Sequence, residues 1–402
     1  MAKMKVLQIN CVYNEGSTGK IVFDIHNHLL KRGYDSIVFY GRGAKNFDFG
    51  VKKITSNNYC RLNSLIGKII GITNGCCLLS TRKIIKGIKK EKPDIVHLHC
   101  INGNFANIYR LLNYLKKENI KTVITLHAEF FYTGGCTHAF ECDQFKSLLG
   151  CVSCSNYKRI TGSIFLNNSK LVWNKLRDCF SNFNELKIIS VSDWLRDRAS
   201  KSTILANKEH LVIKNGIDTD VFSFEKNDNN FSHKRILFVT PYFTDNPNHI
   251  KGGDKLIQIA KDMINENIEF IVVGKSKEKM NLPSNITLIG EINNDSLAHY
   301  YSICDRTILL SKRETFSMVV AESLCCGTPV FGIKCGGPES FAPKEFVDFI
   351  DYKSIYDIED ALKRNLKISY DKQEIAKDSA PVFSNKKMCD EYEKMYLEFM
   401  RE

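Results

Sequence analysis

Hydrophobic positions between residue 4 and about residue 213 alternate between short β-type runs and longer stretches with helical spacing. Short apolar runs separated by amphipathic helices are typical of a parallel sheet that helices cover on both faces. The strands expected from this pattern are 5–9, 36–40, 95–98, 122–126 and 187–191. The helices expected between them are 20–31, 81–90, 104–117 and 193–201.

Segment 215–233 interrupts this rhythm, because Gly216 is followed by several Asp and Asn residues without apolar periodicity, as in a linker. A second alternation follows, with strands expected at 235–239, 269–273, 286–289 and 307–310 and helices beginning near Gly253, Asn294 and Ser317. The pattern therefore predicts an α/β chain with two doubly wound, Rossmann-like domains that face each other across a cleft. Their expected bounds are 1–214 and 234–384.

The last stretch of the chain predicts one more helix. Met388, Tyr392, Met395, Tyr396 and Phe399 recur at helical spacing, so a helix over 385–402 is expected to pack by that stripe. With 402 residues the chain is also too long for one ordinary hydrophobic core, which agrees with two domains.

Composition and charge narrow the classes of function. Hydrophobic residues make up 43% and charged residues 25%, which is close to the globular average. Lys and Arg outnumber Asp and Glu by 57 to 45, and the net charge of +12 favours nucleotide phosphates, nucleic acid or an anionic membrane surface, unless it serves solubility alone. No Arg-rich helix or aromatic RNA-binding motif is present, so no nucleic-acid partner is expected.

The N-terminus leads directly into an apolar strand, without the apolar core or cleavage site of a signal peptide, so a cytoplasmic protein is expected. No apolar stretch reaches the roughly 18 to 20 uncharged residues of a spanning helix. The nearest one, 62–79, contains Lys68 and Asn74, and we expect it at most to lie peripherally on the inner membrane face.

The strongest chemical signal lies around two glutamates in the second half. Glu314 follows a predicted strand, and Glu322 lies eight positions later in a helix that Ser317 would cap. The backbone N–H groups of Met318 and Val319 would lie in the first turn of that helix, whose dipole favours a diphosphate. Glu322, two turns further on, could accept hydrogen bonds from both hydroxyls of a ribose.

Two unrelated acids on a surface helix would have the same spacing. The apolar residues Val319, Val320 and Leu324 and the small-residue turn that follows indicate instead a helix buried against a sheet. An unpartnered Glu322 would be costly there, so this context predicts a ligand or a partner for its carboxylate.

This segment resembles the donor-site signature of retaining glycosyltransferase family 4, the glycosyl transferases group 1, which has the GT-B fold and includes bacterial surface-polysaccharide enzymes. Shorter motifs extend the resemblance nearly end to end. They are the acceptor-side loop Gly16-Ser17-Thr18-Gly19, the strand end 93–99, the hinge 215–218, the donor-side loop Gly336-Gly337-Pro338-Glu339 and Phe383-Ser384. The resemblance implies that the terminal helix crosses back to the first domain.

The resemblance also implies roles for single residues. Glu314 would contact the transferred sugar and Glu322 the ribose. The phosphate cradle would be formed by Phe316, Ser317, Met318 and Val319. Lys251, which precedes Gly252, matches the basic residue that holds the diphosphate. The family often has an Arg a few residues earlier, which 241–250 lacks, so Lys312 or Arg313 is expected to compensate.

Histidines follow two of the predicted strands. His127 resembles the family histidine beside the donor sugar, whereas a histidine at a strand end is otherwise more often structural. We expect the side chains of His97 and His99, on either side of Leu98, to point to opposite faces of their strand. His99 is the one that we assign to the acceptor side of the cleft.

The tripeptide Asp218-Thr219-Asp220 looks like the metal-binding pair of a different transferase fold, but it lies inside the hinge motif. The enzymes that the chain resembles neutralise the leaving diphosphate with Lys, Arg and helix N–H groups. We therefore expect that catalysis requires no cofactor.

Four cysteines form a second constellation, Cys136-x5-Cys142-x8-Cys151-x2-Cys154. This spacing suits a tetrahedral zinc site, which would be structural because four sulfur ligands leave no open position for a substrate. The alternative is four incidental thiols in a chain that contains 15 cysteines.

Together these features predict a retaining glycosyltransferase that moves a sugar from a UDP- or GDP-sugar to a glycan or polyprenyl-linked glycan. The resemblance places it in bacterial polysaccharide biosynthesis, with exopolysaccharide, capsule or the O-antigen of lipopolysaccharide as the product. Two alternatives stay open: a sugar-nucleotide epimerase or hydrolase of the same fold, and a non-catalytic partner subunit.

Overall fold

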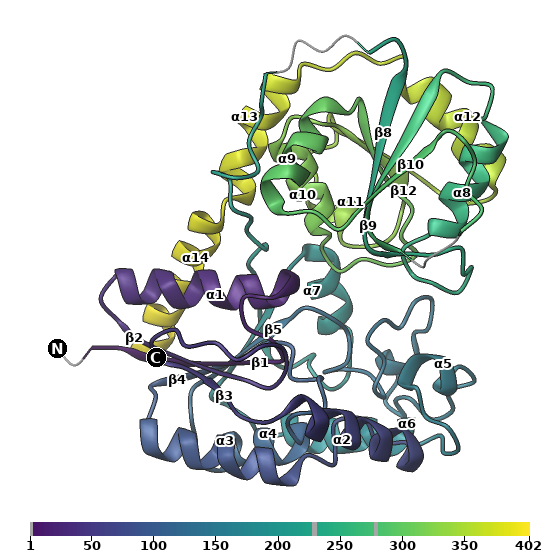
Figure 1. Ribbon diagram of the computed structural model, residues 1–402. Coiled ribbons are helices and arrows are strands. Elements are labelled where there is room, and N and C mark those ends of the chain that lie inside the picture. The colour runs from purple at the N-terminus through teal and green to yellow at the C-terminus, as the bar shows by residue number, and fades with distance from the viewer. Residues whose placement is uncertain (1–2, 227–230, 277–279) are drawn as a thin grey trace. The chain divides into compact units, whose positions relative to one another are not determined.

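The computed structural model describes residues 3–226, 231–276 and 280–402, which divide into two compact units (Figure 1). The first unit comprises Met1–Lys214 and Met388–Glu402, and the second comprises Asn215–Lys387. Each unit contains its own parallel sheet, so the prediction of an α/β chain with two doubly wound, Rossmann-like sheets is confirmed. Part of the predicted linker, residues 227–230, lies outside the described residues.

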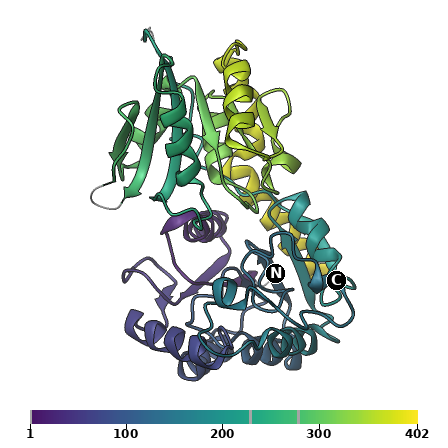
Figure 2. The ribbon, with the colours of Figure 1, turned by 90° about the vertical axis from the view of Figure 1, so that its right-hand side faces the viewer.

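The first unit contains a seven-stranded sheet in the order β3-β2-β1-β4-β5-β6-β7, and every pairing is parallel. The strands are β1 (Lys5–Asn10), β2 (Asp35–Tyr40), β3 (Val51–Lys53), β4 (Ile95–Leu98), β5 (Thr122–Leu126), β6 (Leu186–Ser190) and β7 (Glu209–Val212). Strands β4, β5 and β6 are buried at every position because helices cover both faces of the sheet (Figures 1 and 2).

The helices of the first unit are α1 (Gly16–Lys31), α2 (Asn57–Ile70), α3 (Leu78–Glu91), α4 (Ile108–Lys117), α5 (Tyr157–Thr161), α6 (Ser169–Phe180) and α7 (Asp193–Ser200), with a short 3₁₀ helix η1 (Gln144–Lys146). The apolar stretch 62–79 is divided between α2 and α3, because Gly71 ends α2 in the left-handed conformation. Among the described helices, none combines the length and the apolar character needed to cross a membrane.

Helix α14 (Asn385–Arg401) belongs to the first unit through its apolar stripe. The five stripe residues are buried in one cluster with side chains of α1, β1, β4 and β5. At the rim of this cluster, Glu393 accepts hydrogen bonds from His28 Nε2 at 2.7 Å and Arg32 Nε at 3.1 Å, so polar contacts also join α14 to α1.

The second unit contains a six-stranded parallel sheet in the order β10-β9-β8-β11-β12-β13. Its strands are β8 (Lys234–Phe243), β9 (Ile268–Ser276), β10 (Ile286–Gly290), β11 (Arg306–Leu309), β12 (Val330–Ile333) and β13 (Val347–Ile350). Its helices are α8 (Gly253–Asp262), α9 (Asn294–Ile303), α10 (Met318–Cys325), α11 (Pro338–Phe341), α12 (Ile355–Asn365) and α13 (Lys372–Phe383).

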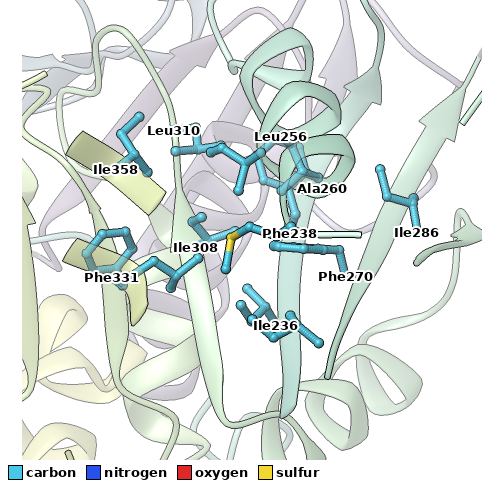
Figure 3. Close-up of a cluster of buried hydrophobic side chains, with 14 of the residues drawn as sticks. Ile236, Phe238, Leu256, Ala260, Phe270, Ile286, Ile308, Leu310, Phe331 and Ile358 are labelled. Atoms are coloured by element: carbon cyan, nitrogen blue, oxygen red, sulfur yellow. The ribbon is translucent and has the colours of Figure 1, made fainter. Parts of the chain in front are cut away.

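The core of the second unit lies between its sheet and the helices α8 and α12 (Figure 3). Ile236 and Phe238 of β8 meet Leu256 of α8, while Phe331 of β12 and Ile358 of α12 extend the same cluster. All five side chains are at most 2% exposed. This packing fixes the strand ends from which the candidate site residues extend.

The substitution Leu256→Ala should lower the free energy of unfolding by about 2 to 5 kcal/mol, because it removes buried methyl groups and leaves a cavity. Urea titration followed by far-UV circular dichroism measures this change. Leu288→Ala is the matched control. Leu288 of β10 is 36% exposed, so this substitution should lower the free energy of unfolding far less. Equal losses in the two variants would contradict the assignment of Leu256 to the core.

Candidate functional site

The predicted donor residues lie on the loops that follow two central strands of the second unit, β8 and β11. These strands pair with each other, and β9 and β12 lie on their outer sides. The direction of the connections therefore reverses between β8 and β11, and α/β sheets bind ligands at the carboxyl ends of such a pair. Lys251 follows β8 and Glu314 follows β11, so both lie at this switch point.

Two close backbone approaches hold the loops of this site in place. A Cβ on Gly252 would lie 2.2 Å from the carbonyl oxygen of Leu310, and Gly252 has a φ of +75°. A Cβ on Gly337 would lie 2.2 Å from the carbonyl oxygen of Thr315. The loops after β8, β11 and β12 can therefore meet only where glycine omits the side chain.

Lys251 and Glu314 form an ion pair in which Nζ donates to Oε1 at 2.7 Å. The backbone also holds Glu314, since its N–H donates to Cys335 and its carbonyl oxygen accepts from Gly337. The side chains of Lys251 and Glu314 are 27% and 12% exposed, so the pair is partly buried. The structure thus brings together two residues that were predicted for two different parts of a donor.

Ser317 occupies the N-cap position of α10, but its side chain makes no capping hydrogen bond. It has a φ of +85°, which costs a residue with a Cβ on the order of 1–3 kcal/mol and is typical of functional sites. Its hydroxyl therefore does not take up the first-turn N–H groups at Met318 and Val319. The ring of Phe316 is buried and stacks on Phe341 at 4.2 Å, so only its backbone can contribute to a phosphate site.

Glu322 accepts a hydrogen bond at Oε2 from the hydroxyl of Tyr301, at 3.0 Å. Burial raises the pKa of Glu322 to about 7, while the hydrogen bond from Tyr301 acts in the opposite direction. Because Tyr301 orients one carboxylate oxygen, Oε1 is available as a second acceptor. Tyr301 comes from α9, and no local sequence signal connects it with Glu322.

The other basic residues near Lys251 and Glu314 lie in different environments. Lys312 donates from Nζ to the carbonyl oxygen of Pro247, and Arg313 is only 8% exposed. His249, which the sequence analysis did not single out, lies near Lys251 and Lys312, and burial together with those charges lowers its pKa. A hollow lined by Lys234, Asn267, Asp305 and Lys372, among others, lies at the amino ends of the strands, away from this crevice.

In the first unit the switch point lies between β1 and β4. The loop after β1 leads into α1 at Gly16, which has a φ of +59°, and the following Ser17 is exposed. Gly19 is buried, and a Cβ there would lie 3.1 Å from Val12. His99 follows β4 and His127 follows β5, so both lie at the same edge of the sheet.

The expectation that His97 and His99 point to opposite faces is wrong. Their ring centroids are 3.8 Å apart, because residues two apart on an extended chain project to the same face. Both histidines are fully buried. His97 hydrogen-bonds Tyr396 at 2.6 Å and Thr125 at 2.8 Å, so it connects the sheet with α14.

His99 contacts His127 rather than open space. Its Nδ1 lies 3.2 Å from His127 Nε2, and its Nε2 lies 3.2 Å from Gln8 Oε1. Gln8 donates its amide N–H to Val22, so its oxygen is an acceptor and His99 Nε2 carries the proton. In neutral His99, Nδ1 then accepts the hydrogen bond that His127 Nε2 donates.

Burial keeps all three histidines uncharged at neutral pH. It lowers the pKa of His127 to about 4, and it lowers the pKa values of His97 and His99 well below the ordinary value of 6.5. His127 can therefore serve as a hydrogen-bonding group and not as a positive charge. Gln8 lies inside β1 and carries no sequence signal for this role.

The four cysteines of the predicted zinc site lie between β5 and α6. Cys136 and Cys151 are buried, and Cys142 and Cys154 are half-buried.

In the hinge motif, Asp218 Oδ1 accepts a hydrogen bond from the backbone N–H of Asp220 at 3.2 Å, so this acid takes part in a turn.

Two family models match the chain. The model described as Glycosyltransferase Family 4 matches residues 18–221, and the model described as Glycosyl transferases group 1 matches residues 224–392. The two matches do not overlap, and together they cover most of both units.

Curated relatives are similar at low identity. The uncharacterized glycosyltransferase MJ1178 of Methanocaldococcus jannaschii is 27% identical over 253 residues, which cover 61% of this chain and 65% of that protein. The N-acetyl-alpha-D-glucosaminyl L-malate synthase of Bacillus anthracis is 22% identical over 412 residues, which cover 100% of this chain and 98% of that protein. The putative colanic acid biosynthesis glycosyl transferase WcaC of Escherichia coli K12 is 21% identical over 360 residues, with 81% and 82% covered.

Solved structures share the fold. Sucrose-phosphate synthase from Thermosynechococcus elongatus has a TM-score of 0.71 at 14% identity, with 99% of this chain and 100% of that chain covered. Anabaena Alr3699/HepE in complex with UDP and glucose has a TM-score of 0.59 at 13% identity, with 98% and 100% covered. WaaG, a glycosyltransferase involved in lipopolysaccharide biosynthesis, has a TM-score of 0.59 at 14% identity, with 93% and 94% covered. The two parallel sheets and these similarities show the GT-B fold.

The free energy of unfolding of the first unit should fall as the pH drops from about 6.5 to about 4. In this range the unfolded histidines take up protons and the buried ones do not, so stability rises with pH. A shift of the pKa of His127 from 6.5 to about 4 corresponds to roughly 3 kcal/mol of the free energy of unfolding. Urea titrations monitored by tryptophan fluorescence test this, because both tryptophans, Trp173 and Trp194, lie in the first unit.

The variant His127→Asn should lose part of this pH dependence. His299→Asn is the control, because His299 is an exposed histidine of α9 in the second unit. An unchanged pH slope in His127→Asn would show that His127 is not excluded from protonation.

Proposed function

This chain belongs to glycosyltransferase family 4, and from that premise we propose that it transfers a sugar from a nucleoside-diphosphate sugar to a glycan or lipid-linked glycan acceptor. The observation that carries the proposal is the Lys251–Glu314 ion pair at the β8–β11 switch point, next to the strained start of α10. A cation, an acid and unused helix N–H groups at one such crevice suit a ligand that contains a diphosphate and hydroxyl groups.

The diphosphate would take over the contact that Lys251 makes with Glu314. When the bond to the sugar breaks, negative charge develops on the leaving phosphate, and a preorganised cation lowers the energy of that state. The first-turn N–H groups of α10 add the positive end of a helix dipole. Lys312, on the same loop as Glu314, supplies a further positive charge after its Nζ exchanges Pro247 for phosphate.

Glu314, released from Lys251, would accept hydrogen bonds from the hydroxyls of the transferred sugar. Glu322 would accept the ribose hydroxyls, with Tyr301 holding Oε2 in position. In the first unit, we propose that His127 is a neutral hydrogen-bond partner for a sugar hydroxyl and that Gly16, Ser17, Thr18 and Gly19 line the acceptor side. Retention of the anomeric configuration is part of the proposal, and nuclear magnetic resonance of the product measures it directly.

The relatives support a product in bacterial polysaccharide biosynthesis. One of them is named for colanic acid biosynthesis, and a structural neighbour is named for lipopolysaccharide biosynthesis. Another structural neighbour was crystallised with UDP and glucose, which supports a nucleotide-sugar donor here. UDP- and GDP-sugars are the donors to be tested first.

We also propose that the first unit contacts an anionic membrane that carries such an acceptor. Four apolar side chains of α2 are between 37% and 56% exposed, namely Leu62, Leu65, Ile66 and Ile69. They recur at helical spacing and therefore form one outward stripe, and α2 contains no acidic residue. An exposed stripe of this kind suits the boundary between lipid headgroups and acyl chains.

Helix α3, whose start contacts the start of α2, adds positive charge to the same unit. Its exposed residues include Arg82, Lys83, Lys86, Lys89 and Lys90. The starts of the two helices are in contact, since the backbone N–H of Leu79 donates to Tyr59 at 3.2 Å. Basic residues and an apolar stripe on two successive helices match the charge and the chemistry of an anionic lipid surface.

A panel of UDP- and GDP-sugars tests the function. A transferase should release nucleoside diphosphate from one of them when an acceptor is present, and much more slowly without it. Release that does not depend on acceptor would favour the hydrolase or epimerase. Absence of both binding and release across the panel would favour a partner subunit.

Glu322→Ala should weaken binding of the nucleoside diphosphate by about 10- to 100-fold, since hydrogen bonds to a charged group contribute about 1.5–3 kcal/mol. Glu314→Ala should bind the nucleotide nearly normally and turn over slowly. Isothermal titration calorimetry and the release assay measure the two effects. Glu345→Ala is the control, because Glu345 is an exposed glutamate of the same unit.

The pH dependence provides an independent test of the Glu322 assignment. Because the pKa of Glu322 is about 7, wild-type affinity for the nucleotide should rise from pH 6 to pH 8 as the carboxylate forms. Glu322→Gln should lose this dependence. If Glu322→Ala binds as tightly as the wild type, Glu322 does not hold the ribose.

The double variant Leu62→Ser/Leu65→Ser should reduce sedimentation with phosphatidylglycerol vesicles by about tenfold or more. Leu62 and Leu65 are 56% and 51% exposed, and burial of the exposed halves of both contributes on the order of 1.5 kcal/mol or more. Leu148→Ser/Leu149→Ser is the matched control, because these leucines are 84% and 72% exposed elsewhere in the same unit. Binding should also weaken with added salt. Equal binding of both variants, or none by the wild type, would contradict the membrane proposal.

A further inference from the structure

A long segment with little secondary structure of its own joins β5 to α6, over residues 127–168. It contains only the 3₁₀ helix η1 and the five-residue helix α5. Several of its apolar side chains are exposed, including Leu148 and Leu149, so the segment does not form a complete core of its own. Loops longer than about 12–15 residues are uncommon in compact domains unless a function or a bound group accounts for them.

One part of this segment is fixed by a buried carboxylate. Glu129 is fully buried and accepts hydrogen bonds from Arg198 at 2.7 Å, from Tyr132 at 3.0 Å and from the backbone N–H of Ala139 at 2.6 Å. Arg198 belongs to α7, so this ion pair ties the start of the segment to the rest of the unit. The part that follows residue 139 has further anchors: Arg198 Nη1 lies 3.8 Å from Asp143 Oδ1, Thr203 Oγ1 donates to the carbonyl oxygen of Ser147 at 3.2 Å, and the ring of Phe145 is buried against Tyr132.

The four predicted zinc ligands lie in this segment, with Cys136 before Ala139 and Cys142, Cys151 and Cys154 after it. The thiol of Cys136 lies within electrostatic reach of the thiols of Cys142, Cys151 and Cys154. Cys142 and Cys154 are also within reach of Cys151. None of the four forms a disulfide. Residues that are up to 18 positions apart in sequence therefore share one neighbourhood, although no regular element pairs them.

Two glycines allow the chain to approach itself here. A Cβ on Gly134 would lie 2.8 Å from the Cβ of Cys151, and the backbone N–H of Gly134 donates to Cys151 Sγ at 3.1 Å. A Cβ on Gly150, which has a φ of +67°, would lie 2.2 Å from the ring of Trp173. The backbone N–H next to Sγ is the kind of contact that orients a metal-bound thiolate.

We propose that Cys136, Cys142, Cys151 and Cys154 bind one structural zinc ion. Four thiols lose their protons as Zn²⁺ binds, so the site carries a net charge of −2 and has no open coordination position. Zinc–sulfur bonds of about 2.3 Å would draw the four sulfur atoms closer together than they are here. The side chains of Leu148 and Leu149 would not oppose such a shift, since they are 84% and 72% exposed.

A second group of possible metal ligands, His28, Asp390 and Glu393, is closely spaced but already has a positively charged neighbour. Among the described residues, the ligand atoms of His28, Asp390 and Glu393 lie within 4.8 Å of one another. Arg32 already supplies a positive charge there, with Nε 3.1 Å from Glu393. That cluster is therefore an ion-pair network, whereas four soft thiolates suit zinc.

The proposal has a consequence for the first unit's site, although it does not depend on the proposed function. The segment begins at His127, and Glu129 and the zinc ion would fix it at two places. Loss of the metal should therefore loosen the surroundings of His127 while the sheet persists.

Elemental analysis of the full chain, purified without chelator, tests the site. We expect one zinc ion per chain, and X-ray absorption should show four sulfur ligands at about 2.3 Å. Cys142→Ser and Cys154→Ser should each lower the zinc content severalfold. Cys76→Ser is the matched control, because Cys76 is a half-buried free thiol elsewhere in the same unit, and it should keep its zinc.

Cobalt provides a second readout that does not require a folded cysteine variant. Titration of the metal-depleted wild type with Co²⁺ should produce the thiolate-to-metal charge-transfer absorption of a four-sulfur site, and Zn²⁺ should abolish it. Absence of zinc in the purified chain together with absence of this absorption would overturn the proposal. A disulfide among the four cysteines in freshly purified protein would overturn it as well.

Discussion

Compensation of charge between Lys251 and Glu314 is the constraint on which the second unit's site depends. The two side chains come from loops after different strands, and they meet because β8 and β11 are neighbours in the sheet although β9 and β10 separate them in sequence. An ammonium and a carboxylate at 2.7 Å neutralise each other, so each can be held in a partly buried crevice without a ligand. Under the proposed function, a diphosphate would have the charge required to separate them, and donor binding would be coupled to the release of Glu314.

In the first unit, by contrast, the histidines of the candidate site are uncharged. His97, His99 and His127 are buried together, and proximity of three charged imidazoles would be unfavourable. The hydrogen bond that Gln8 Oε1 accepts from His99 defines which nitrogen of His99 carries the proton. His97 lies between the hydroxyls of Thr125 and Tyr396. Since Tyr396 lies on α14, the last helix of the chain contributes to the order of a site formed mainly by the first half.

Local motifs pointed to some residues of these candidate sites and not to others. Lys251, Glu314 and Glu322 could be found from sequence because each follows a strand or begins a helix at a recognisable spacing. Tyr301, Gln8 and His249 could not, since each acts through a contact between elements that are far apart in sequence. The opposite orientation expected for His97 and His99 was wrong for a local reason, namely that the side-chain period of a strand is two.

The sequence by itself determined the class of fold, two parallel sheets, because buried parallel strands require continuous apolar runs and the intervening helices require amphipathic spacing. It also determined the family, because the donor motif is contiguous. Only the tertiary structure decided the strand order, and with it the pairing of Lys251 with Glu314 and of Glu322 with Tyr301. The physical reason is that hydrophobic periodicity specifies which face of an element is buried, whereas the partner across that face is selected by packing of the whole unit.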